Sequence, residues 1–262
     1  MRVLALVLLC LAAFGQPATT PQNDGQANQQ KARTLVAQMI TALGGQAYLT
    51  LQDSQIEGRT GVFYHGRSEG GGVFRRFWQW PGNERWEFTK QRDIVNLYVG
   101  DKAYETTFRG TQALDPNRDD ALRRFMLRRH YALEIIARNW FSDPGTAFFY
   151  EGPGLAENHS VERVTIMNNK DEAVTLLIDT DSHLPVKKTF ITRDPQTRDR
   201  DQIDEIYDNW KKIQGVSTPQ NTLVSFNGDL YRQYFVTSVT YNSQLAASLF
   251  NPGPLNYDRS KQ

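Results

Sequence analysis

Residues 161–193 read VERVTIMNNKDEAVTLLIDTDSHLPVKKTFITR and contain three apolar-rich segments separated by two short polar links. The segments are 161–167, 173–179 and 184–193, and Asn, Asp, Ser and His fill the links between them. Short apolar segments bounded by turn residues are typical of consecutive antiparallel strands. This stretch therefore predicts a three-stranded meander.

The same pattern extends from this meander in both directions. Gly, Pro, Asn or Asp bounds most of the segments, and the further strands predicted are 56–64, 73–80, 84–90, 94–99, 102–108, 203–213, 222–227 and 231–241. No repeat of 20–50 residues is visible, which argues against a propeller or solenoid. The strands do not alternate with helices as a parallel sheet requires. We expect one strongly curved antiparallel sheet of about 10–11 strands.

Two helices are predicted beside this sheet. Leu35, Met39, Ile40 and Leu43 recur at helical spacing from residue 31, and Gly44-Gly45 follows as a left-handed helix end. A longer helix is expected over 118–141, with an apolar stripe of Leu122, Phe125, Met126, Leu133, Ile136, Ala137 and Trp140. The fold class is therefore α+β, mainly β, with helices on one face of the sheet.

Length and composition indicate one globular domain. The chain has 262 residues, of which 39% are hydrophobic and 11% aromatic, and a chain of this size can bury a core without disulfides or metals. Thirty Lys and Arg residues against 29 Asp and Glu give a net charge of +1, which argues against nucleic-acid binding. Outside the N-terminus, no apolar run approaches the ~20 residues that span a bilayer.

The N-terminus has the parts of a secretory signal peptide. Arg2 precedes an apolar run, and a small residue lies at Gly15, where we expect cleavage, so residues 1–15 are the signal peptide. Cys10 is poorly placed as a lipid-modified cysteine, because Leu9 precedes it. The exported protein then contains no cysteine, which excludes thiol catalysis. We expect a disordered linker at 16–30, the folded domain at 31–257 and a polar tail at 258–262.

Large apolar side chains gather on the predicted strands. Alternate residues of a strand share a face, so Phe74, Trp78 and Trp80 are expected on one side of the sheet. Such a face either packs against the helices as core or encloses an apolar ligand. The residues alone leave both readings open. The full set proposed for a cavity is Phe74, Trp78, Trp80, Trp86, Phe88, Leu97 and Tyr104.

No pattern of catalytic residues is evident. His130 and Glu134 are spaced i, i+4 on the long predicted helix, where we expect a surface hydrogen bond or ion pair. No zinc motif, nucleophile elbow or nucleotide-binding loop occurs. We therefore expect no catalytic residue, no metal site and no cofactor.

Four stretches resemble the LolA-like superfamily of periplasmic lipoprotein carriers and outer-membrane lipoprotein-sorting proteins. They are LVAQMITALGG at 35–45, LLIDTDSHLPVKKTF at 176–190, EIYDNWKKIQGVSTP at 205–219 and VTSVTYNSQLAASLFNP at 236–252. The resemblance implies an incomplete β-barrel whose apolar cavity takes acyl chains beneath a helical lid, without cofactor or catalysis. The lid residues would be Leu122, Phe125, Met126, Leu133, Ile136 and Trp140.

The resemblance also implies a role for arginine, because carriers of this family latch their lid with an arginine on the sheet. Arg75, Arg76 and Arg85 are candidates for that role. On the helix, Arg124 and Arg128 could contact anionic head groups or lie on a solvated face. The expected ligand is an acylated lipoprotein or lipid, and the expected partners are membrane-associated donor and acceptor proteins. We expect a periplasmic monomer.

Two other functions stay open at this stage. An exported interaction or scaffold domain of the same fold would have a dry core in place of the cavity. A secreted hydrolase would need His130, Glu134 and a further acid or histidine around one cleft.

Overall fold

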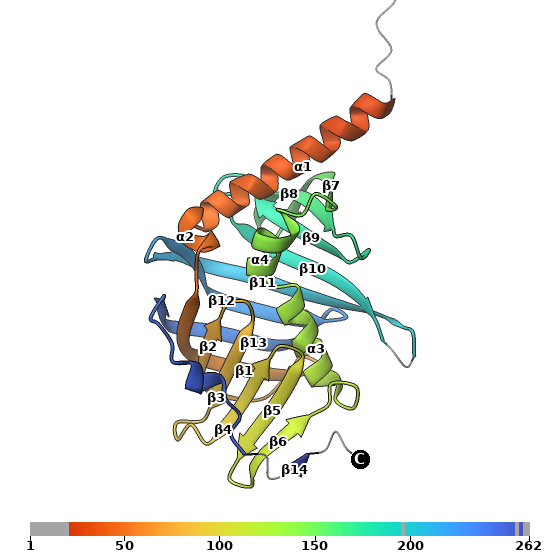
Figure 1. Cartoon of the computed structure of the whole chain (residues 1–262). Helices are drawn as coiled ribbons and strands as arrows, with labels where there is room; N and C mark the ends of the chain where they lie inside the picture. The colour runs from red at the N-terminus through yellow and green to blue at the C-terminus, as the bar shows by residue number, and fades with distance from the viewer. Residues whose placement is uncertain (1–20, 195–196, 255–256, 259–262) are drawn as a thin grey trace, which may run out of the picture.

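The computed structural model describes residues 21–194, 197–254 and 257–258 (Figure 1). The predicted signal peptide at 1–15 lies outside the described residues, as do residues 16–20 of the predicted linker and 259–262 of the predicted tail. All the described strands belong to one sheet, which curves around the helices and is not closed.

The sheet is antiparallel except at one edge, where β14 pairs with β6 in parallel. Its order is β14-β6-β5-β4-β3-β2-β1-β13-β12-β11-β10-β9-β8-β7. The first half contains β1 (Asp53–Tyr64), β2 (Arg67–Gln79), β3 (Asn83–Phe88), β4 (Ile94–Val99), β5 (Lys102–Thr107) and β6 (Gly110–Leu114). The second half contains β7 (Ala147–Ala156), β8 (His159–Met167), β9 (Ala173–Asp179), β10 (Pro185–Arg193), β11 (Arg200–Ile213), β12 (Val216–Phe226) and β13 (Asp229–Tyr241), whereas β14 (Tyr257–Asp258) lies beside β6 at the edge of the first half.

The mainly β, curved antiparallel architecture confirms the predicted fold class, and the meander at 161–193 forms β8, β9 and β10. Three strands were not predicted. β6 and β14 are short, and β7 contains Gly152 and Pro153, residue types that favour turns. An edge strand tolerates these two residues because one side of it makes no ladder hydrogen bonds. β7 is such an edge strand.

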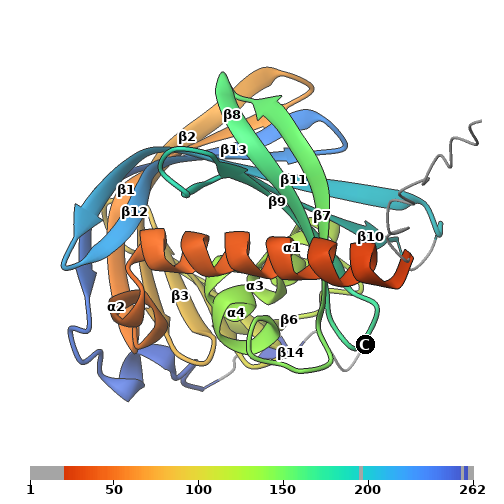
Figure 2. The ribbon, with the colours of Figure 1, turned by 90° about the horizontal axis from the view of Figure 1, so that it is seen from above.

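Helix α1 (Pro21–Leu43) crosses the open side of the sheet (Figure 2). It ends as predicted, since Gly45 has φ 56°, and a Cβ on Gly44 would lie only 2.7 Å from the carbonyl oxygen of Gly215. α1 is followed by the short α2 (Gln46–Leu49).

The start of α1 corrects the predicted linker, because residues 21–30 are helical. The side chain of Asn28 donates to the carbonyl oxygen of Tyr150 at 2.8 Å and accepts from its backbone nitrogen at 2.9 Å. This amide therefore takes the place of a strand partner at the free edge of β7. Tertiary contact thus holds a segment whose composition suggested disorder.

The long helix predicted over 118–141 is three pieces in the structure: α3 (Asp120–His130), α4 (Leu133–Ile135) and the π-helical turn η1 (Ile136–Trp140). In a continuous helix the Tyr131 carbonyl would accept from residue 135. The buried Lys188 Nζ donates to this carbonyl at 2.7 Å instead, and Ala132 is extended. The tertiary contact therefore breaks the helix.

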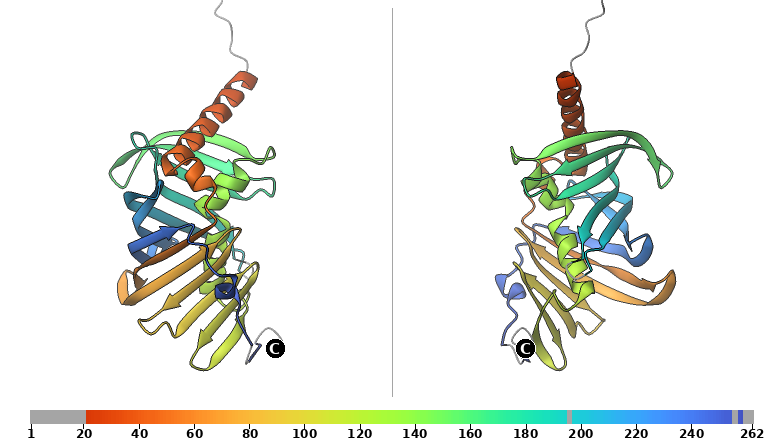
Figure 3. Two further views of the ribbon diagram at one scale, coloured as in Figure 1. Left: turned by 60° about the vertical axis from the view of Figure 1, so that its left-hand side comes forward. Right: turned by 90° about the vertical axis from the view of Figure 1, so that its right-hand side faces the viewer.

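Apolar side chains are buried on both faces of β2–β4. On the concave face Phe74, Trp78 and Trp86 join the main core with α1 and α3. On the outer face Phe77 and Leu97 pack with Phe250 of the C-terminal 3₁₀ turn η2 (Ala247–Phe250). Figure 3 shows this C-terminal segment on the outside of the sheet, away from α3.

Candidate functional site

A cavity of about 700 Å³ lies between the concave face of the sheet and the α3–η1 segment. This volume is within the range of roughly 300–1,000 Å³ that ligand pockets occupy. Its wall combines apolar and aromatic side chains with several charged ones. The sheet contributes Ile56, Phe74, Trp78, Trp86, Tyr207, Trp210, Tyr234, Val236 and Tyr241, among others.

Three of the aromatic residues predicted for the cavity line it, namely Phe74, Trp78 and Trp86. Phe74 and Trp86 lie in contact, with ring centroids 5.2 Å apart. Trp80 and Phe88 pack beside them: Phe88 stacks on Trp86 at 6.1 Å, and Trp80 lies 6.2 Å from Trp78. These five residues are therefore brought together on the concave side.

The prediction that Leu97 and Tyr104 line the cavity is wrong. In the strand register Leu97 lies opposite Arg85 and Tyr104, while Asn96 lies opposite Trp86. Leu97 and Tyr104 therefore belong to the outer face, where they pack in the cluster with Phe250.

The predicted lid residues divide between cavity and core. Phe125, Met126, Leu133 and Trp140 line the cavity. Leu122 and Ile136 are buried in the main core instead. Phe125 stacks on Tyr98 of β4, with centroids 4.5 Å apart. The segment therefore covers the cavity with some of its apolar side chains and anchors itself with others.

One cluster of charges surrounds Glu84 of β3. This carboxylate accepts from Arg76 of β2 and from the Trp86 indole at 2.9 Å, and Arg129 of α3 lies 3.1 Å away. Arg129 also donates to the carbonyl oxygen of Gly82. Burial alone would raise the pKa of Glu84, but Arg76 and Arg129 lower it below its usual value.

A second cluster surrounds Glu205 of β11. Arg128 Nε lies 2.6 Å and Lys188 Nζ 3.0 Å from this carboxylate, and the Tyr207 hydroxyl donates to it at 2.6 Å. Burial would raise the pKa of Glu205, but Lys188 and Arg128 lower it far below the usual range. Burial and the same carboxylate raise the pKa of Tyr207, which stays protonated.

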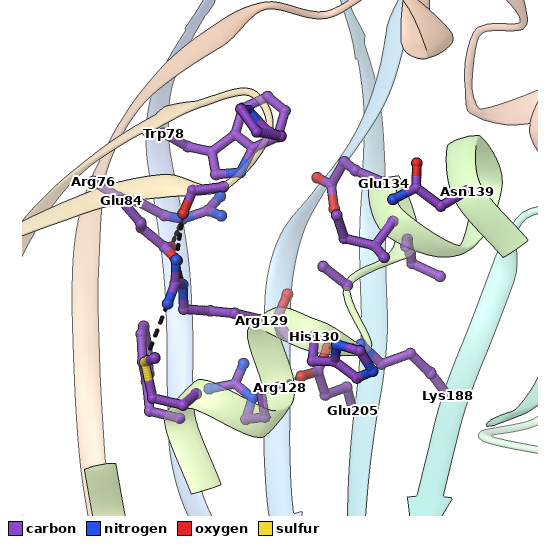
Figure 4. Close-up of a pocket in the computed structure, with 18 of the residues that line it drawn as sticks. Arg76, Trp78, Glu84, Arg128, Arg129, His130, Glu134, Asn139, Lys188 and Glu205 are labelled. Carbon is purple, nitrogen blue, oxygen red and sulfur yellow. Dashed lines mark hydrogen bonds and ion pairs between the residues drawn. The ribbon is translucent and has the colours of Figure 1, made fainter. Parts of the chain in front are cut away.

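Figure 4 shows how the two clusters lie. Arg76, Glu84 and Arg129 are together on one side of the cavity, and Arg128, Glu205 and Lys188 are on the other. Arg128 and Arg129 are consecutive in the last turn of α3. This helix is therefore fastened to the sheet on both sides of the cavity.

The five arginines singled out in the sequence have different environments. Arg76 and Arg128 line the cavity. Arg75 pairs with Glu57 at 3.0 Å, and Arg85 pairs with Glu87 at 2.8 Å and bonds the Leu249 carbonyl on the outer face. Arg124 lies over the Phe226 ring, with its guanidinium carbon 4.3 Å from the centroid.

The predicted contact between His130 and Glu134 does not form. α3 ends at His130, whose Nε2 lies 2.9 Å from Glu172. Glu134 comes from α4, lines the cavity, and makes no hydrogen bond or ion pair with another described residue. The two residues are separated by the break at Ala132, which i, i+4 spacing cannot reveal.

Sequence reasoning missed Glu84, Glu205, Lys188 and Glu134 as residues of this site. The alternation that placed Phe74 and Trp78 on one face also places Arg76 there. The partners of Arg76 come from other strands, whose register the sequence does not give.

Comparison with solved structures finds the same fold in three proteins of low sequence identity. A DUF1329 family protein from Desulfovibrio piger has a TM-score of 0.58 at 12% identity, covering 86% of this chain and 97% of that one. A putative outer membrane lipoprotein-sorting protein domain from Vibrio parahaemolyticus has a TM-score of 0.57 at 10% identity, covering 86% of this chain and 97% of that one. A LolA superfamily protein from Nitrosomonas europaea has a TM-score of 0.54 at 12% identity, covering 84% of this chain and 97% of that one. The chain therefore has the LolA-like fold.

No protein-family model matches the chain, and no curated protein matches it. Within the described ranges, no helix is long and apolar enough to span a membrane.

Proposed function

We propose that this protein is a carrier that shelters the acyl chains of a lipid or lipoprotein in the cavity beneath α3. The cavity of about 700 Å³, walled by Phe74, Trp78 and Trp86, is the observation that carries this proposal. Each buried CH₂ group contributes about 0.8 kcal/mol. A chain of about ten methylenes would therefore gain about 8 kcal/mol before the cost of ordering it.

The setting we propose is the periplasm, with transfer between membrane-associated donor and acceptor proteins. The charged and apolar pattern of residues 1–15 supports export. The shared fold with a structure described as a lipoprotein-sorting domain supports the kind of cargo. The N-terminal pattern and the shared fold are independent observations.

Two other functions have less support. A scaffold with a dry core would need the helices to fill the concave face, whereas the cavity lies between them and the sheet. The residues that a hydrolase would need, namely His130, Glu134 and a further acid in Glu172, do line the cavity. His130 pairs with Glu172, however, and makes no hydrogen bond with Glu134. The carrier function is therefore the one we put forward.

Native mass spectrometry of the protein purified from the periplasm without detergent tests the proposal. We expect a co-purifying acylated mass. Trp78→Arg should abolish it, because the substitution places an unpaired charge in the cavity wall. Phe108→Arg is the matched control, since this side chain is 88% exposed, and it should leave the bound mass unchanged.

Val236→Trp is a second variant that adds bulk to the cavity wall without adding charge. It should also reduce the bound mass, and circular dichroism should show that both cavity variants remain folded. A protein that stays free of bound mass and takes up no added phospholipid or acylated peptide would contradict the proposal.

A further inference from the structure

Arg76 has hydrogen-bonding capacity that the protein leaves unused. Its Nε donates to Glu84, and the described residues offer it no other hydrogen bond or ion pair. Its two terminal nitrogens lack a partner, yet neither is among the fully buried polar atoms without one. Arg76 lines the cavity, and Figure 4 shows its side chain reaching from β2 toward the cavity.

Unpaired terminal nitrogens of this kind suit a particular chemistry. The planar guanidinium presents N–H groups in a fixed fork that matches the oxygens of a carboxylate or phosphate. Arg129, which shares Glu84 with Arg76, is more fully engaged, because each of its three guanidinium nitrogens already has a partner in Glu84, the Gly82 carbonyl or the Met126 sulfur. Arg76 is therefore the site to which an anionic group can add.

The charge balance inside the cavity points the same way. The two clusters and Glu134 place four cations against three carboxylates, namely Arg76, Arg128, Arg129 and Lys188 against Glu84, Glu134 and Glu205. One positive charge is left over. The other charged residues of the lining are exposed or bonded locally, namely Asp101, Lys170, Asp143 with Gly145, and Glu172 with His130.

Glu134 is the charge that opposes an added anion. Burial lowers the pKa of Arg76, but Glu84 and Glu134 raise it by more, so Arg76 stays charged. Glu134 itself has no hydrogen-bond partner in the described part of the chain. Removing its charge therefore breaks no contact and leaves the cavity more positive.

We propose that the ligand is an anionic amphiphile whose single negative head group accepts hydrogen bonds from the terminal nitrogens of Arg76. Its chain then lies along Phe74, Trp78 and Trp86. This inference rests on the proposed carrier function. A fatty carboxylate and a phosphodiester lipid share the required chemistry.

Binding of a fluorescent fatty acid and of its methyl ester tests the inference, because the two probes differ only in head-group charge. We expect the acid to bind about tenfold more tightly than the ester, as a charged hydrogen bond allows. Arg76→Gln should weaken acid binding about tenfold and change ester binding less than about twofold. Arg75→Gln, next in sequence but on the outer face, should change neither.

Glu134→Gln should have the opposite effect and strengthen binding of the fatty acid, because it removes the negative charge that opposes the head group. It also keeps the test decisive if Arg76→Gln fails to fold once Glu84 has lost a partner. Extraction from phosphatidylglycerol vesicles, but not phosphatidylcholine vesicles, would identify a phosphodiester lipid as the source. Acid binding without extraction would identify a fatty carboxylate.

Equal affinity for acid and ester, equal extraction from both vesicles, or weaker acid binding by Glu134→Gln would overturn the inference and leave the carrier function standing. Failure to bind either probe or to extract either lipid would overturn the carrier function itself.

Discussion

Arg128 of α3 and Glu205 of β11 form a nearly buried ion pair, with Nε 2.6 Å from Oε1 and side chains 13% and 8% exposed. The next residue, Arg129, reaches Glu84 of β3 at 3.1 Å. Strands β2, β1, β13 and β12 separate β3 from β11 in the sheet. Neighbouring residues of a helix point about 100° apart, so two consecutive arginines can contact strands as far apart in the sheet as β3 and β11.

Arg128→Met should lower the free energy of unfolding by about 3 kcal/mol, because it leaves the buried Glu205 with one fewer cation. Lys188 remains beside this carboxylate, so the loss falls at the low end of the range for broken buried pairs. Urea unfolding measures the change. Arg75→Met, which removes a half-exposed pair with Glu57, should cost less than about 1 kcal/mol. Equal losses would contradict the assignment.

Stability should decrease in acid because of the buried carboxylates. Lys188 and Arg128 lower the folded-state pKa of Glu205 below 4.5, and Arg76 and Arg129 do the same for Glu84. The stabilisation is complete above pH 4.5. It is lost as the pH falls below that value, because the unfolded chain takes up protons first.

Urea midpoints at pH 7, 5, 4 and 3 check this expectation. Glu205→Gln removes one of the two groups, so its midpoint should change less between pH 5 and pH 3 than that of the unmodified protein. A parallel decline in both proteins would show that Glu205 does not contribute to the acid response.

Asp53 should hold the C-terminal segment in place. Its carboxylate accepts from the backbone nitrogens of Ser243, Gln244 and Leu245 and from the Ser243 hydroxyl, at 2.7–3.3 Å. Asp53→Ala should cost at least about 2 kcal/mol and make residues 243–250 accessible to protease. Asp53→Asn keeps one acceptor oxygen and should have a smaller effect. Unchanged cleavage of Asp53→Ala would contradict this role.

Asn28→Ala should expose the edge of β7, since the main chain of Tyr150 loses the two hydrogen bonds that it makes with the Asn28 side chain. Unpaired strand edges promote association between chains. We expect larger species in size-exclusion chromatography as the protein concentration rises. Thr34→Ala, on the exposed side of α1, is the control and should stay unchanged.

The strands were largely predictable because alternating apolar residues and bounding turn residues are local signals in the sequence, as β4 at 94–99 illustrates. The face of each strand was harder to predict. Leu97 and Tyr98 are both largely apolar, so alternation could not decide which one lies on the concave face. The answer depends on Phe250, which covers the outer face from far along the chain.

The charged part of the site was not predictable for a related reason. Arg76 lies in the same alternation as Phe74, but its role depends on Glu84 and on the approach of Arg129. The helix break at Tyr131 likewise depends on Lys188, which follows 57 residues later. Contacts between distant segments determine both features, and a local pattern does not contain them.

The burial of β2–β4 on both faces has a consequence for motion. A sheet region packed on both sides opens only at a free energy close to that of global unfolding. α3, by contrast, borders the cavity, and Arg128 and Arg129 in its final turn pair with Glu205 of β11 and Glu84 of β3. We therefore expect that α3 moves when a ligand enters the cavity, while strands β2–β4 keep their positions.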